Sequence, residues 1–155
     1  MSNLINIFRS PFKVKLYFFK KLPSLFFWKI RVEEIDIYKS KISIPFCWRT
    51  QNPFKSIYFS ALAGAAELST GLLAFLAVEN RDVSMLVVGV KGRFTKKANT
   101  RSYFICEDGQ ALINAVKKAI ETGEGQTVEV QSRGYNEIDE LIAEFEFTWS
   151  FKKRG

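Results

Sequence analysis

The residue with the clearest chemical potential is Glu67, a carboxylate in the most apolar part of the chain. It lies in SALAGAAELSTG, residues 60–71, and is the only acidic residue between Asp36 and Glu79. At 100° per residue, a helix over this segment places seven residues within about 120° of one another: Ser60, Ala63, Gly64, Glu67, Thr70, Gly71 and Ala74. Such a small-residue face lets a partner helix, a sheet or a ligand approach closely.

A carboxylate in such a groove is partly desolvated, which raises its pKa unless hydrogen-bond donors satisfy it. Glu67 is therefore a candidate general base or nucleophile. The same pattern also fits a buried acid that an arginine or a backbone N–H satisfies, or an acid that reaches solvent at the helix edge.

Composition excludes several other kinds of site. The chain has no histidine, which excludes Ser-His and Cys-His catalysis and histidine-ligated metals. Cys47 and Cys106 are far apart and lack metal-ligand spacing, so we expect no metal and no disulfide. We also expect no cofactor, and the cysteine usage favours a reducing, cytoplasmic location.

The net charge of +7 is concentrated at the start of the chain. Residues 1–31 hold seven basic residues and no acid, whereas the rest of the chain carries sixteen of each. This distribution does not predict a nucleic-acid-binding face. Residues 1–31 are also rich in phenylalanine, which fits either a membrane-surface segment or a helical flap that covers the core and leaves its lysines in water.

A long helix, expected over residues 57–77, must position Glu67. Its apolar stretch is about long enough to span a membrane, but Glu67 interrupts it and basic flanks are lacking, so we expect no transmembrane span. A shorter helix is expected after Asp108, as its N-cap, and ends near Gly123.

Strands are expected around this helix. In LIAEFEFTWSF, residues 141–151, apolar and polar residues alternate, as in a half-buried antiparallel strand. Leu86, Val88, Val90 and Phe94 are expected on one face of a strand over 84–94. The other expected strands are 29–37, 41–48, 101–106 and 126–133.

These elements predict one α+β domain over residues 1–155, with residues 1–28 as an N-terminal helical extension. Short turns between strands favour an antiparallel sheet. A single very apolar helix needs that sheet curved around it to bury most of its surface.

The segment PFCWRTQNPFKSIYFSALAGAAELSTG, residues 45–71, resembles the helix-entry segment of an uncharacterised bacterial branch of the hotdog-fold thioesterase superfamily. The resemblance covers residues 22–152 and implies a curved antiparallel sheet wrapped around one long central helix. Acyl-CoA thioesterases of the phenylacetate-pathway type carry N-x-x-G-x-x-H-G-G, then an Asp on the central helix fifteen residues after the Asn; in the 4-hydroxybenzoyl-CoA thioesterase type, a Glu can hold that role. The same spacing separates Asn52 from Glu67.

The resemblance implies thioester hydrolysis, with Glu67 activating water or attacking the carbonyl and Asn52 orienting the nucleophile or the thioester. The N–H groups of Phe59 and Ser60 would hold the oxyanion at the helix N-terminus. Tyr58 takes the place of the motif histidine and Phe59-Ser60 that of Gly-Gly, so a module that binds acyl thioesters or acyl groups without catalysis is the alternative.

The ligand implied is an acyl group on coenzyme A or acyl carrier protein, and the assembly implied is a homodimer or homotetramer with its sites at the dimer interface. Ser84 lies near a position where some relatives have a polar active-site residue. A basic cluster fits either the phosphates of the ligand or a solvated strand edge: Lys91, Arg93, Lys96, Lys97 and Arg101.

Overall fold

The computed structural model describes residues 3–155, which form five helices and six strands. The helices are α1 Asn3–Phe8, α2 Pro11–Lys21, α3 Pro23–Phe27, α4 Phe59–Val78 and α5 Gly109–Thr122. The strands are β1 Arg31–Ile35, β2 Ser40–Ile44, β3 Val83–Phe94, β4 Ser102–Cys106, β5 Gln126–Tyr135 and β6 Leu141–Lys153.

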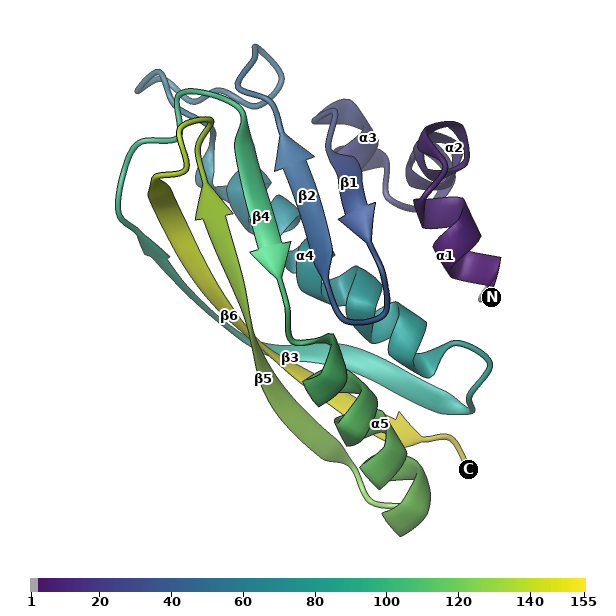
Figure 1. Ribbon diagram of the computed structural model, residues 1–155. Coiled ribbons are helices and arrows are strands. Elements are labelled where there is room, and N and C mark those ends of the chain that lie inside the picture. The colour runs from purple at the N-terminus through teal and green to yellow at the C-terminus, as the bar shows by residue number, and fades with distance from the viewer. Residues whose placement is uncertain (1–2) are drawn as a thin grey trace.

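In this part of the chain the strands form one six-stranded antiparallel sheet in the order β1-β2-β4-β5-β6-β3. Figure 1 shows α4 running across one face of the curved sheet. This confirms the predicted hotdog fold, in which the sheet wraps around a long central helix. The order leaves β1 and β3 as the two edges of the sheet.

Helix α4 is the centre of the core. It begins two residues later than predicted, because Tyr58 has extended backbone angles and occupies the N-cap position. Most of its alanines and leucines are buried. Among residues 3–155 it is the one helix long and apolar enough to cross a membrane by length and composition, yet 67% of that window is buried inside the fold. It therefore has the character of a core helix.

Strand β6 confirms the predicted alternation, because Phe145, Phe147, Trp149 and Phe151 are all buried. Strand β3, its neighbour, corrects one prediction. A bulge between Val87 and Gly89 shifts the register with β6. An extra residue in one strand reverses the alternation beyond it.

As a result, Leu86 lies opposite Ser150 on the outer face of the sheet, whereas Val90 and Phe94 lie opposite Phe147 and Ala143 on the inner face. The predicted single apolar face of residues 84–94 is therefore wrong. Leu86, Val88, Val90 and Phe94 are all exposed along this edge of the sheet.

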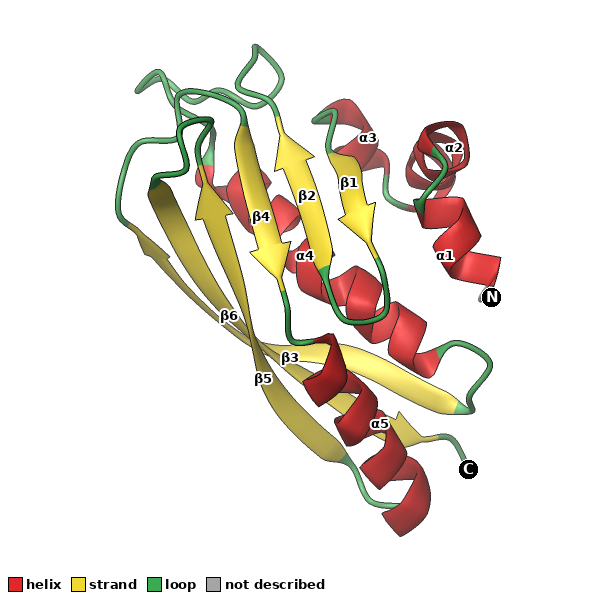
Figure 2. Cartoon of the chain, in the orientation of Figure 1, coloured by secondary structure: helices red, strands yellow, loops and turns green. Residues whose placement is uncertain are grey.

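Helices α1, α2 and α3 lie beside the β1 edge (Figure 2). They contribute Phe8, Phe18 and Leu25 to the buried core. Trp28, which follows α3, packs against α4, since a Cβ atom on Gly64 would be 3.0 Å from Trp28 Cζ3. The first part of the small-residue face of α4 therefore receives a tryptophan from the chain's own N-terminal region.

Two further expectations are corrected. The strands predicted over 29–37 and 41–48 are only five residues long each. Asp108 occupies the N-cap position of α5, but its side chain does not cap that helix. Its Oδ2 instead accepts a hydrogen bond of 2.7 Å from the backbone N–H of Gln131 in β5. Gly123 ends α5 in the left-handed conformation, as predicted.

Candidate functional site

Glu67 lies on α4, half-buried among small residues. Burial raises the pKa of its carboxyl above the usual range for a glutamate, and no charged or hydrogen-bonding group opposes that shift. Within residues 3–155, every fully buried polar side-chain atom has a hydrogen-bond partner. The carboxylate oxygens of Glu67 have none there, so they reach solvent. A desolvated acid that is still open to solvent is available for chemistry.

The groups around Glu67 explain why the neighbouring residues are small. A Cβ atom on Gly71 would lie 2.9 Å from Glu67 Oε1 and 3.4 Å from Trp149 Cζ2. Trp149 Nε1 donates a 3.0 Å hydrogen bond to Thr70 Oγ1, and that hydroxyl donates to the Glu67 carbonyl oxygen over 3.0 Å. Gly71 thus leaves the space that the carboxylate occupies beside the indole ring.

The N-terminus of α4 offers unpaired N–H groups. The carbonyl of Tyr58 accepts hydrogen bonds from Ala61 and Leu62, at 3.0 and 3.2 Å. No backbone acceptor takes the N–H groups of Phe59 or Ser60 in the described chain. The Tyr58 and Phe59 rings are both exposed and meet edge to face, with centroids 5.2 Å apart. Two aromatic rings therefore flank the predicted oxyanion donors.

Asn52 lies in the loop that enters α4, and its side chain is engaged there. Its Oδ1 accepts hydrogen bonds from the backbone N–H of Phe54 and Ser56, at 2.9 and 3.3 Å, and from the Ser56 hydroxyl at 3.2 Å. These contacts stabilise the turn over residues 52–56. Its catalytic role stays a prediction.

Ser84 lies at the opposite end of α4 from Phe59, because β3 begins shortly after α4 ends. A helix of this length spans about 30 Å. The Ser84 hydroxyl donates a 3.1 Å hydrogen bond to the Lys152 carbonyl across the strand pair. One copy of the chain therefore does not bring Ser84 to the helix N-terminus.

Three cations of the predicted basic cluster, Lys91, Arg93 and Lys96, pair with acids on β6 and the turn before it. The other two do not: Lys97 donates to the Phe54 carbonyl oxygen, and Arg101 donates to the Ser43 hydroxyl. Lys91 Nζ is 2.7 Å from Glu146 Oε1, and Arg93 Nη2 is 2.8 Å from Glu144 Oε2. The hydrogen bond from Lys91 is the main cause that lowers the pKa of the Glu146 carboxyl. A phosphate at these cations would have to replace the carboxylates, so phosphate binding there stays a prediction.

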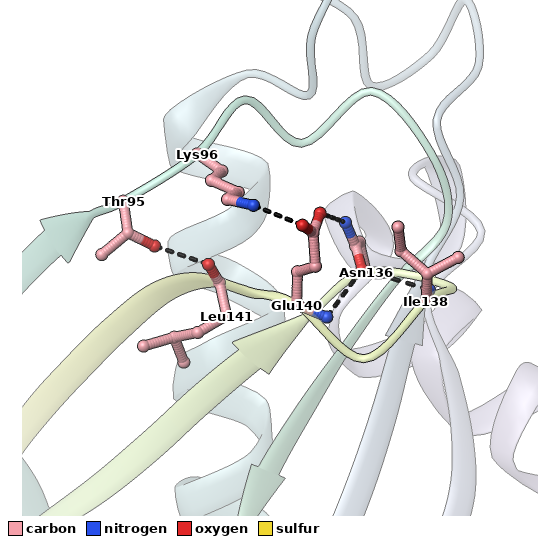
Figure 3. A network of polar contacts seen from close by, with 6 residues as sticks. All are labelled: Thr95, Lys96, Asn136, Ile138, Glu140 and Leu141. Atoms are coloured by element: carbon pink, nitrogen blue, oxygen red, sulfur yellow. Dashed lines mark hydrogen bonds and ion pairs between the residues drawn. The ribbon is translucent and has the colours of Figure 1, made fainter.

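Lys96 belongs to a network at the β5–β6 turn (Figure 3). Its ammonium contacts Glu140, which also accepts a 2.9 Å hydrogen bond from Asn136 Nδ2. Hydrogen bonds from Lys96 and then Asn136 lower the pKa of the Glu140 carboxyl. Thr95 donates to the Leu141 carbonyl oxygen over 2.6 Å, which joins the end of β3 to the start of β6. The network closes this end of the sheet.

Sequence reasoning missed two features. The bulge in β3 leaves Val90 and Phe94 exposed on the inner face, and period-two alternation carries no signal for it. A cleft of about 720 Å³ also lies between α2, α3 and β1, away from Glu67. Its lining includes Val14, Phe18 and Ile30, which simple helix and strand patterns assign only to core.

Comparison with solved structures shows the same architecture. A Pseudomonas aeruginosa protein of unknown function, described as a probable thioesterase, superimposes with a TM-score of 0.77 at 17% identity, over 96% of this chain and 99% of that one. A thioesterase from Haemophilus influenzae superimposes with a TM-score of 0.70 at 13% identity, over 93% of this chain and 91% of that one. A mutant thioesterase from Pseudomonas aeruginosa superimposes with a TM-score of 0.72 at 16% identity, over 96% of this chain and 99% of that one.

The protein therefore belongs to the α+β class and has the same hotdog fold as these solved structures. Within it, residues 13–151 match the model of DUF4442, a domain of unknown function, and the chain belongs to that family. A search of curated proteins finds no significant match.

Proposed function

We propose that the protein hydrolyses acyl thioesters of coenzyme A or acyl carrier protein, with Glu67 as general base or nucleophile. The observation that carries this proposal is the unpaired, desolvated Glu67 carboxylate on the central helix of a fold shared with proteins described as thioesterases. As a base, Glu67 takes a proton from water as the water oxygen attacks the carbonyl carbon. The C–S bond then breaks, and the products are a carboxylic acid and a thiol.

The oxyanion of the tetrahedral intermediate needs donors, and the free N–H groups of Phe59 and Ser60 supply them in this proposal. Phe59 and Glu67 are eight residues apart on one helix, which is about 12 Å along its axis. In the tetrahedral intermediate, the attacking oxygen and the oxyanion are bonded to the same carbon, so Glu67 and the donor N–H groups of a single chain are too far apart to serve both. The proposed site therefore combines the helix N-terminus of one copy with Glu67 of a second copy.

The edge strand β3 supports such a pairing. Its twelve residues form one edge of the sheet, with exposed Leu86, Val88, Val90 and Phe94 along it. A long apolar edge is a template for pairing with another chain. We propose a homodimer formed through this edge.

Activity is tested with acyl-CoA substrates of short to long chain length and detection of the released thiol. Wild-type protein is expected to release thiol, and Glu67→Gln is expected to lose that activity while keeping its circular dichroism spectrum and a melting temperature no lower than that of wild type. Glu121→Gln, on the exposed side of α5, is the matched control. Unchanged hydrolysis by Glu67→Gln would exclude the assigned role.

The composite site is tested with mixed dimers. Phe59→Pro removes one donor N–H, and the extended backbone of Tyr58 (ψ 135°) suits a following proline at the first helical position. Phe59→Ala is its control, because it keeps the N–H. A dimer of one Glu67→Gln chain and one Phe59→Pro chain should regain about half of the wild-type activity, since one of its sites contains neither change. No regain contradicts a site built from two copies.

A non-catalytic module that binds acyl thioesters is the second candidate. The exposed Phe59 ring beside Tyr58 favours it, because both rings flank the approach to the donor N–H groups. Calorimetric binding of acyl-CoA without release of thiol, for every chain length tested, would support this candidate and contradict hydrolysis.

A further inference from the structure

Helix α2 has two apolar faces, and the fold buries only one of them. Val14 and Phe18 point into the core. Phe12, Leu16 and Phe19 follow one another at helical spacing on the other side, with exposed fractions of 77%, 45% and 60%. The packing of the protein itself therefore does not explain these three side chains.

The exposed row continues onto α3 and the loop after β2. The Phe19 and Phe26 rings are 5.3 Å apart, and those of Phe27 and Trp48 are 6.3 Å apart. Trp48 is 75% exposed. We call this surface the N-terminal aromatic face; it consists of the exposed Phe12, Leu16, Phe19, Phe27 and Trp48, together with the half-buried Phe26.

Cations surround the N-terminal aromatic face. At 100° per residue, Lys15 and Lys20 flank the row on α2 from either side. Residues 1–31 contain seven basic residues and no acid. Arg49 lies over the Phe27 ring, 5.6 Å from its centroid. An apolar row with lysines on both sides is the pattern of a helix that lies in a membrane interface.

The cleft between α2, α3 and β1 has the same character. Val14, Phe18 and Ile30 are its buried apolar lining. Its basic lining residues are Lys15, Lys29, Arg31 and Arg49. The acid among the lining residues, Glu33, accepts a hydrogen bond from the Ser43 hydroxyl. The cleft therefore joins an apolar interior to cations, which suits a ligand with an acyl chain and an anionic head group.

We propose that the N-terminal aromatic face docks on an anionic phospholipid bilayer. The aromatic side chains enter the boundary between head groups and acyl chains, and the surrounding lysines contact lipid phosphates. A second copy of this chain is a poorer occupant, because it would bring its own N-terminal cations against these. The bilayer matches both the apolar row and the sign of the charge.

Co-sedimentation of the full-length protein with vesicles tests this proposal. Binding is expected with vesicles of phosphatidylcholine and phosphatidylglycerol, and it should weaken with phosphatidylcholine alone or at high salt. Phe12→Ser combined with Phe19→Ser should abolish pelleting. Lys15→Gln combined with Lys20→Gln should lower the partition coefficient about 25-fold, since each lysine contributes about fivefold.

Matched controls carry the same changes elsewhere on the surface. Lys117→Gln with Lys118→Gln alters two exposed lysines of α5, and Ile138→Ser alters an exposed apolar residue of the β5–β6 turn. Both should pellet as wild type does. Absence of wild-type binding, or equal pelleting of all variants, overturns the proposal. So does sedimentation velocity in which Phe12→Ser with Phe19→Ser dissociates an oligomer without changing vesicle binding.

Discussion

Glu67 is an ionisable group that the fold makes harder to ionise. Burial raises its pKa, so the folded state holds the proton more tightly than the unfolded chain does. The stability of the wild-type protein should therefore decrease as the pH rises from the usual range of a glutamate through the raised pKa. Below that range the acid is protonated in both states, and its contribution to the pH dependence vanishes.

Glu67→Gln should remove this pH dependence. The free energy of unfolding of the variant should exceed that of wild type at neutral pH, by about 1.4 kcal/mol for each tenfold increase in proton affinity on folding. The two proteins should converge at acidic pH. Urea titrations across the pH range measure the difference, and a constant offset at every pH would contradict the assigned desolvation.

Gly71→Ala should separate the position of the carboxylate from the stability of the helix. A methyl group there would meet Glu67 Oε1 at 2.9 Å, so the carboxylate must move. Alanine favours a helix over glycine by about 1 kcal/mol, which offsets the contact. If Glu67 is catalytic, we expect a loss of activity approaching about 100-fold, with a melting temperature close to wild type.

Gly64→Ala is the comparison for that variant. Its methyl group would meet Trp28 at 3.0 Å, on a ring held by packing rather than on a mobile carboxylate. Gly64→Ala should lower the melting temperature and leave the activity of the folded protein close to that of wild type. Equal effects of the two alanines on activity would show that Gly71 has no special relation to Glu67.

Among the strands, β3 presents a long edge with exposed apolar side chains. The bulge at Val87–Gly89 turns Val90 and Phe94 inward, while Leu86 stays on the outer face, so exposed apolar side chains lie on both faces of this edge. Short, charged or covered edges prevent pairing in many proteins, and β3 is twelve residues long. Its outer-face cations instead pair with Glu144 and Glu146.

Leu86→Lys combined with Val90→Lys should convert the proposed dimer to a monomer. Both side chains are exposed in the single chain, so its fold should tolerate the changes. Sedimentation velocity measures the mass, with Ile138→Lys as an equally exposed control on the β5–β6 turn. A wild-type protein that is monomeric at micromolar concentration, or a variant that stays dimeric, contradicts pairing through β3.

At the scale of the whole molecule, α1, α2 and α3 are part of the core. Phe8 and Phe18 are almost fully buried, and the Phe8 ring lies 6.3 Å from that of Phe75 on α4. Removing these helices would expose that side of the central helix. For this reason, point substitutions test the N-terminal region better than truncation does.

Substitution of two phenylalanines of α2 should change the stability by very different amounts. Phe18 is 2% exposed, so Phe18→Ala should lower the free energy of unfolding by about 3–5 kcal/mol. Phe12, on the other side of the same helix, should change it by about 0.5 kcal/mol or less when replaced by alanine. Chemical denaturation measures both. Similar losses for the two variants would contradict the docking of α2 described here.

Local patterns in the amino-acid sequence predict the core elements and the candidate acid. The helix predicted over residues 57–77 forms over 59–78, and the alternation predicted over 141–151 falls within β6, because both patterns depend on local spacing. Asn52 and Glu67 were identified by spacing and resemblance. Helical periodicity alone places Glu67 on the small-residue face.

The surroundings of these residues depend on tertiary packing. The β3 bulge, the docking of Trp28 on Gly64, and the pairing of Lys91 with Glu146 all join positions far apart in the chain. A periodic pattern shows which face of an element is apolar, but not which neighbour covers that face. Packing settles this, because long-range contacts compete for each surface, and it left Glu67 unpaired and α2 with a second, exposed apolar face.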